Sequence, residues 1–298
     1  MDDFSWQPDP NSGITIDWVK ANGLQFEVAM AGEGDRLALC LHGFPELHYS
    51  WRHQMPLLAR MGYRVWAPNM RGYGATSRPE GIRSYALDHL TQDVAALIDA
   101  SGAKEVTLIA HDWGAVVAWN FAILKLRPLT RLIIMNVPHP MVGRREIKRW
   151  EQFRKSWYIF FFQLPWLPEM LLGKGGHGKA IGQIFERTSC NPERFGPEVQ
   201  TVYSAAAVRP GALNAMVNYY RALLKFRDSV DLGDCRIEIP TLMVWGEEDV
   251  ALNIKCTVGT EDWVPNITVR RLPNVSHWVQ QDAPERVNSI LEEWLPAN

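Results

Sequence analysis

The chain has 298 residues, of which 47% are hydrophobic and 21% are charged, a composition typical of a globular protein with a large core. Its 31 Lys and Arg nearly balance 33 Asp and Glu, so the net charge of −2 gives no sign of a nucleic-acid-binding protein. The N-terminus is acidic and polar, unlike a signal peptide, and the longest apolar stretch, residues 157–162, is far too short to span a bilayer.

Strand and helix patterns alternate through the first 140 residues. Five apolar runs with strand-like patterns lie there, at residues 24–30, 36–41, 65–67, 106–110 and 132–137. Two segments between the later strands have the apolar spacing of helices, at residues 87–100 and 114–126. Strand and helix repeated in this order predict an α/β fold, with a mostly parallel sheet covered by helices on both faces.

The pattern changes after residue 140, where residues 141–227 are aromatic and helical without a strand candidate. Two further strand patterns and a closing helix then follow, at residues 241–245, 267–272 and 285–294. The simplest organisation is one α/β core, formed by residues 1–140 and 228–298, that is interrupted by a helical lid over residues 141–227. Such a lid should cover an active site built from loops at the carboxyl ends of the strands.

The densest basic stretch of the chain lies at the start of this lid and contains Arg144, Arg145, Lys148, Arg149, Arg154 and Lys155. A stretch of this kind is typical of the solvent-facing side of a helix, and we prefer that interpretation to a site for an anionic partner. Thirteen tryptophans fit a lipophilic pocket because of their broad apolar faces, although core packing alone would also use them.

The first candidate for chemistry is Asp112, which follows the strand pattern of residues 106–110 and precedes a helix. Its neighbours Ala110 and Gly114 are small, as required where a strand turns sharply into a helix and presents a reactive side chain. This is the geometry of a nucleophile elbow, which commonly holds serine, but no G-x-S-x-G occurs in the chain. The alternative is that Asp112 merely caps the following helix.

A glycine-containing turn follows the strand pattern of residues 36–41 and could face this elbow. Gly43 allows a backbone N–H, expected to be that of Phe44, to point towards Asp112, and the N–H of Trp113 would be a second donor. Two such donors would form an oxyanion hole and would also hold the Asp112 carboxylate ionised. His42, in the same turn, is expected to be structural.

An acid and a histidine each follow a later strand, Asp249 after residues 241–245 and His277 after residues 267–272. The chain order of nucleophile, acid and histidine is the one expected for a nucleophile elbow in an α/β fold. Glu248 is the nearest substitute acid. A lone histidine is more often packed or exposed, but the coincidence of these pieces favours a catalytic role for His277.

Together these motifs resemble those of the α/β-hydrolase superfamily and, within it, of the soluble epoxide hydrolases. The resemblance runs from about residue 23 to residue 294. It is carried by H-G-F-P-E at residues 42–46, R-G-Y-G-A-T-S at 71–77, H-D-W-G-A at 111–115, N-V-P-H-P at 136–140 and the segment 246–249. It implies the α/β-hydrolase fold, a mostly parallel central sheet flanked by helices, with a helical lid inserted after the sixth strand.

The resemblance also implies a role for each candidate residue. Asp112 would be the nucleophile, Asp249 and His277 would complete the triad, and Phe44 and Trp113 would supply the N–H groups of the oxyanion hole. The proline after Phe44 is usually cis in this family.

An aspartate nucleophile limits the substrate, because a carboxylate is already charged and can displace a leaving group at saturated carbon. Epoxides and alkyl halides both fit. An opening epoxide leaves a basic alkoxide that needs an acid, and soluble epoxide hydrolases use two lid tyrosines for this task. The resemblance places them at Tyr158 and Tyr220. The alternative is that both only pack the lid, as Tyr219 is expected to do.

The sequence thus predicts an epoxide hydrolase, which opens epoxides to vicinal diols through a covalent alkyl ester on Asp112 that is hydrolysed by water activated by His277. The runner-up is a haloalkane dehalogenase, because such enzymes often share H-D-W-G, although they more often have a polar residue at the position of Phe44. The third hypothesis is a non-catalytic ligand receptor on the same fold, against which the intact triad positions argue.

No cofactor and no metal is expected, because the chain has no G-x-G-x-x-G, no G-x-x-x-x-G-K and no H-E-x-x-H. The four cysteines form no C-x-x-C pair, so we expect free thiols and a cytoplasmic protein. The expected partners are a small lipophilic epoxide and water. Neither nucleic acid nor a membrane span is expected, and a homodimer is left open.

Overall fold

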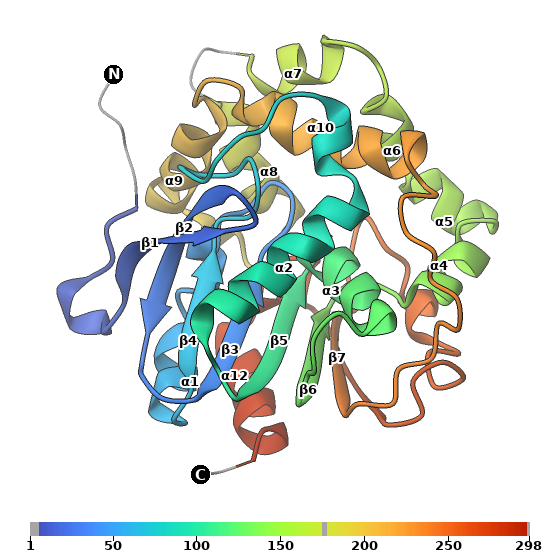
Figure 1. Ribbon diagram of the computed structural model, residues 1–298. Helices are drawn as coiled ribbons and strands as arrows, with labels where there is room; N and C mark the ends of the chain where they lie inside the picture. The colour runs from blue at the N-terminus through green and yellow to red at the C-terminus, as the bar shows by residue number, and fades with distance from the viewer. Residues whose placement is uncertain (1–5, 175–177, 297–298) are drawn as a thin grey trace.

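Eight strands form one sheet in the order β1-β2-β4-β3-β5-β6-β7-β8, in a computed structural model that describes residues 6–174 and 178–296 (Figure 1). The strands are β1 (Thr15–Ala21), β2 (Leu24–Ala31), β3 (Arg36–Leu41), β4 (Arg64–Pro68), β5 (Glu105–His111), β6 (Arg131–Met135), β7 (Thr241–Gly246) and β8 (Ile267–Leu272). The pairs from β4 to β8 are parallel, and β2 pairs antiparallel with both β1 and β4. The expected mostly parallel sheet is confirmed.

The sequence patterns did not predict β1. This strand lies at the edge of the sheet, and only Val19 and Ala21 of its seven residues are buried. It therefore lacks the regular alternation that reveals a half-buried strand. The inner strands behave differently, because both of their faces are covered: all six residues of β7 and all but the first residue of β3, β5 and β6 are buried.

Helices cover both faces of the sheet (Figure 1). The first face packs with α2 (Leu87–Ser101) and α3 (Trp113–Leu124), and the second with α1 (Met55–Arg60), the short α11 (Val279–Asp282) and α12 (Pro284–Trp294). The alternation along β3 shows this division, because Leu39 packs in the first of the two cores and Cys40 in the second. Short 3-10 helices occur at Pro10–Ser12, His48–Trp51, Ile82–Tyr85, Pro192–Phe195 and Ile254–Thr257.

The chain between β6 and β7 is helical and contains no strand in its described residues. Its helices are α4 (Pro140–Glu146), α5 (Trp150–Lys155), α6 (Trp157–Phe161), α7 (Leu167–Leu172), α8 (Lys179–Thr188), α9 (Pro197–Ala207) and α10 (Ala212–Lys225). Figure 1 shows α6 to α10 gathered beyond one end of the sheet, with α4 and α5 at its side. None of the helices in the described ranges is long and apolar enough to cross a membrane.

Candidate active site

Asp112 occupies the sharp turn between β5 and α3. Its backbone angles are φ 45° and ψ −121°, a region that side-chain-bearing residues rarely adopt. Two glycines make room for this turn. A Cβ on Gly43 would lie 2.7 Å from Cγ of Asp112, and a Cβ on Gly114 would lie 2.6 Å from the carbonyl oxygen of His42. Larger residues at 43 or 114 would therefore displace the carboxylate or the turn that faces it.

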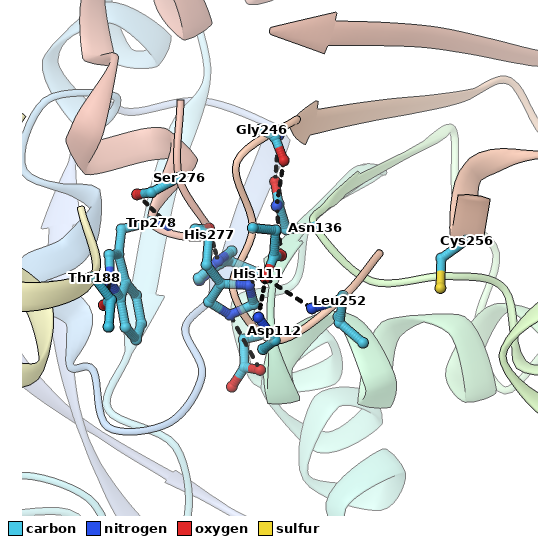
Figure 2. Close-up of polar contacts among 12 residues, drawn as sticks. His111, Asp112, Asn136, Thr188, Gly246, Leu252, Cys256, Ser276, His277 and Trp278 are labelled. Carbon is cyan, nitrogen blue, oxygen red and sulfur yellow. Dashed lines mark hydrogen bonds and ion pairs between the residues drawn. The ribbon is translucent and has the colours of Figure 1, made fainter. Parts of the chain in front are cut away.

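The Asp112 carboxylate has a different partner at each oxygen. The backbone N–H of Phe44 donates to Oδ1 at 2.6 Å, and Nε2 of His277 lies 3.5 Å from Oδ2 (Figure 2). Burial alone would raise the pKa of Asp112, but the hydrogen bond and charge of His277, with help from Phe44, hold it below its ordinary value. Trp113 begins α3, and N–H groups in the first turn of a helix have no intrahelical acceptor. The Phe44–Pro45 peptide bond is cis.

His277 also contacts a second carboxylate. Its Nδ1 lies 2.6 Å from Oδ2 of Asp249, which is fully buried. The backbone N–H groups of Ala251 and Leu252 donate to the other oxygen of Asp249 at 2.7 and 2.8 Å. Burial opposes the charge on His277, yet the two aspartates raise its pKa well above its ordinary value. The alternative acid, Glu248, is exposed to solvent.

Asn136 is a positioning residue at the start of the N-V-P-H-P motif, and the sequence patterns assigned it no role of its own. It lies directly after β6 with φ 50°, and its side-chain amide donates to Oδ2 of Asp249 at 2.8 Å. Its amide oxygen accepts the backbone N–H of Gly246 at 2.9 Å (Figure 2). Asn136 therefore ties the end of β6 to the end of β7 and orients the carboxylate that faces His277.

Glu46 is a buried acid to which the sequence patterns assigned no role. Oε2 of Glu46 lies 2.7 Å from Nδ1 of His111 and accepts the N–H of Gly43 at 3.0 Å. Oε1 accepts the side-chain amides of Gln280 and Gln281 at 2.8 and 2.9 Å. The other ring nitrogen of His111 lies 2.8 Å from the backbone carbonyl oxygen of residue 277. This network fixes the backbone of His277.

The two candidate lid tyrosines lie together in an aromatic cluster. The rings of Tyr158 and Tyr220 are 5.8 Å apart, and the Tyr220 ring lies 5.3 Å from Phe44 and 5.0 Å from Trp113. Burial and the charge of Asp112 raise the pKa of both tyrosines, so both remain protonated at neutral pH. The hydroxyl of Tyr219 instead donates to the backbone carbonyl of Arg71 at 2.8 Å, which is a packing contact.

His42, in the turn beside the site, has a structural contact, as expected. His42 accepts the N–H of Met70 through Nε2 at 2.9 Å, and burial lowers its pKa to about 4, so the ring is neutral. Within residues 6–174 and 178–296, no group of His, Cys, Asp and Glu side chains could hold a metal ion. All four cysteines are free thiols.

The chain has many relatives among known proteins. Residues 39–284 match the family model described as alpha/beta hydrolase fold. The chain is 39% identical over 288 residues to AB hydrolase superfamily protein YfhM of Bacillus subtilis, covering 95% of this chain and 98% of that protein. It is 37% identical over 284 residues to Epoxide hydrolase 4 of Homo sapiens, covering 93% of this chain and 77% of that protein.

Solved structures of epoxide hydrolases are also similar to this chain. The crystal structure of Bacillus megaterium epoxide hydrolase in complex with an inhibitor superposes with a TM-score of 0.84 at 27% identity, covering 93% of this chain and 99% of that one. The epoxide hydrolase VrEH1 from Vigna radiata gives a TM-score of 0.81 at 32% identity, covering 94% of this chain and 97% of that one.

Proposed function

Because the chain belongs to the α/β-hydrolase fold family and, within it, to the epoxide hydrolases, we propose that it opens epoxides to vicinal diols in two chemical steps. The observation that carries this proposal is the pair of contacts at Asp112, with a backbone N–H on one carboxylate oxygen and His277 beside the other. This arrangement keeps a carboxylate ionised in a buried site, where it can attack carbon. We also propose that residues 141–227 act as the lid over this site.

In the first step, one oxygen of Asp112 attacks an epoxide carbon and the carbon–oxygen bond of the ring breaks. The product is an alkyl ester on Asp112 and an alkoxide on the neighbouring carbon. The alkoxide is a far stronger base than a phenolate, so it takes a proton from the hydroxyl of Tyr158 or Tyr220 as it forms. Both hydroxyls are protonated at neutral pH, so each has a proton to donate.

In the second step, His277 takes a proton from water, and the resulting hydroxide attacks the ester carbonyl carbon. The carbonyl oxygen becomes an oxyanion that accepts the N–H groups of Phe44 and Trp113. Collapse of this intermediate expels the diol oxygen, which takes the proton from His277. The carboxylic acid left at Asp112 then loses its proton, which returns through solvent to the tyrosinate, so the carboxylate and both tyrosines are restored. Asp249 keeps the proton-accepting nitrogen of His277 towards the ester and stabilises the imidazolium that forms.

Ester formation also switches His277 from acid to base. In the free protein its pKa is raised by two carboxylates, Asp249 and Asp112. The ester on Asp112 is uncharged, so one of these two anionic neighbours is lost and the pKa of His277 falls. The histidine thus becomes a competent base only after the covalent bond has formed.

We therefore expect Asp112→Asn, which mimics the neutral ester, to lower the pKa of His277 relative to the wild-type protein. Histidine NMR titration measures this shift directly. In single-turnover experiments, the rate of ester hydrolysis should fall as the pH drops through the lowered pKa of His277. Alkylation should persist to lower pH, because Asp112 stays ionised there. An unchanged pKa of His277 in Asp112→Asn would disprove the switch.

Removing both lid hydroxyls should distinguish epoxide from halide chemistry. In Tyr158→Phe/Tyr220→Phe, the alkylation rate for an epoxide should fall by on the order of 10² to 10⁴, because the alkoxide has no acid. Either single variant should retain more activity, since the other hydroxyl still donates. Tyr219→Phe is the matched control and should alkylate normally, because its hydroxyl contacts the backbone of Arg71. If the double variant opened epoxides at the wild-type rate, Tyr158 and Tyr220 would not be the acids.

The alternative, haloalkane dehalogenation, uses the same nucleophile but releases a stable anion that needs no proton. The apolar side chain of Phe44 lies where a polar residue would be expected to contact a halide, which favours the epoxide. Assaying halide release from chloroalkanes and bromoalkanes beside diol formation tests this choice. Halide release without diol formation would reverse the assignment.

A further inference from the structure

Helices α5 and α6 carry a cluster of exposed aromatic side chains. The exposed fractions are 72% for Trp150, 45% for Phe153, 63% for Trp157 and 50% for Phe160. The rings of Trp150 and Phe153 stack at 6.1 Å, and those of Phe153 and Phe160 are 5.6 Å apart, so the surface continues from one helix to the next. We call these four residues the aromatic patch. Large apolar side chains that are exposed side by side mark an interaction surface.

The aromatic patch is separate from the packing around the candidate active site. On α6, Tyr158 turns towards Phe162 and Tyr220, while Trp157 and Phe160 stay in solvent. The same short helix therefore has one side over the site and another side facing outward. The outward side has no partner among the described residues that would explain its large apolar side chains.

Exposed basic residues flank the aromatic patch, namely Arg144, Lys148, Arg149 and Arg154. Arg154 lies four residues after Trp150 on α5 and hence on the same face of that helix. Arg149 pairs with Glu146, but Arg144, Lys148 and Arg154 form no ion pair with a carboxylate in residues 6–174 or 178–296.

The acidic residues nearby do not cancel this charge. Glu151 on α5 is paired with Lys255 at 2.7 Å. Residues 140–172 contain six Lys and Arg against three Glu, whereas the whole chain has a net charge of −2. The aromatic patch thus lies within a locally positive stretch of the lid.

We propose that the aromatic patch and its basic flank dock this protein on the surface of an anionic lipid bilayer. Trp and Phe side chains insert favourably at the boundary between headgroups and acyl chains, and Lys and Arg bind the lipid phosphates. The chain would lie on the bilayer without spanning it. Docking does not depend on the proposed reaction, but it would place α6 beside the phase in which a lipophilic epoxide dissolves.

A second copy of this chain fits the same surface less well. In a two-fold contact, the same patch is used by both subunits, so Arg144, Lys148 and Arg154 would approach their own copies. Like charges facing each other across an interface oppose association. An anionic lipid surface instead complements both the apolar and the basic side chains.

Flotation of the full chain with vesicles tests this proposal. Vesicles of phosphatidylcholine mixed with phosphatidylglycerol should carry the protein, and pure phosphatidylcholine vesicles should carry much less. Arg144→Gln/Lys148→Gln/Arg154→Gln should lower the partition coefficient on anionic vesicles by on the order of 100-fold, because each basic residue contributes roughly fivefold. Trp150→Gln/Trp157→Gln should lower it by roughly tenfold or more, through loss of buried apolar area.

Matched variants outside the patch serve as controls. Trp18→Gln removes another exposed tryptophan, on β1, and Lys20→Gln/Arg60→Gln/Lys125→Gln removes the same charge elsewhere. Both should bind anionic vesicles better than the patch variants, and thermal unfolding should be unchanged in all four proteins. Absence of binding to anionic vesicles, or equal losses in patch and control variants, would overturn the proposal. So would a dimer in solution that Trp150→Gln/Trp157→Gln dissociates without any vesicle binding by the wild type.

Discussion

Replacing Asp112 with alanine is expected to abolish epoxide turnover, with a loss on the order of 10⁴-fold or more, because the first covalent bond can no longer form. Diol formation by the purified variant measures the loss, and circular dichroism checks that the chain is folded. Asp99→Ala is the matched control. Asp99 is exposed and pairs only with Arg127, so its removal should leave turnover intact.

No neighbouring carboxylate should replace Asp112. Glu46 is fully buried, and both of its oxygens are already engaged by His111, Gly43 and the two glutamines. Asp249 faces the opposite ring nitrogen of His277. A folded Asp112→Ala protein with near wild-type diol formation would therefore remove the covalent mechanism itself, since no other acid in this region is placed to attack.

The part of the site that could be predicted from the sequence rests on local patterns. The apolar run of β5, the small residues beside Asp112 and the helix that follows all lie between residues 105 and 124, so one window reveals the turn. Asp249 and His277 likewise lie soon after strands, three residues after β7 and five residues after β8. Their meeting in space required only that parallel strands end at the same edge of the sheet.

The parts that escaped prediction depend on distant residues or on weak burial. Glu46 contacts Gln280 and Gln281, which are 234 and 235 residues away, and no local pattern links them. Asn136 acts through Asp249, 113 residues away. The strand β1 has an irregular pattern because it is an exposed edge. The tyrosine assignments needed a resemblance, since helical aromatic residues in a lid predict packing equally well.

Replacing His277 with glutamine should separate the two chemical steps. The N–H of Phe44 still donates to the Asp112 carboxylate, which can therefore still open the epoxide, but no base activates water against the ester. Steady-state turnover should fall by on the order of 10² to 10⁴, the usual contribution of a general base. Intact-protein mass spectrometry after mixing with an epoxide should show the protein heavier by one whole substrate, and peptide mapping should locate the adduct on Asp112.

Asp249→Asn provides the graded comparison for this experiment, because it weakens the orientation and charge stabilisation of His277 without removing the base. It should hydrolyse the ester faster than His277→Gln and accumulate less adduct. In the wild-type protein, a single turnover in water enriched in heavy oxygen should label Asp112 before it labels the diol, since water attacks the ester carbonyl. Label found at once in the diol and never in Asp112 would mean that water attacks the epoxide directly, and Asp112 would then be a base and not a nucleophile.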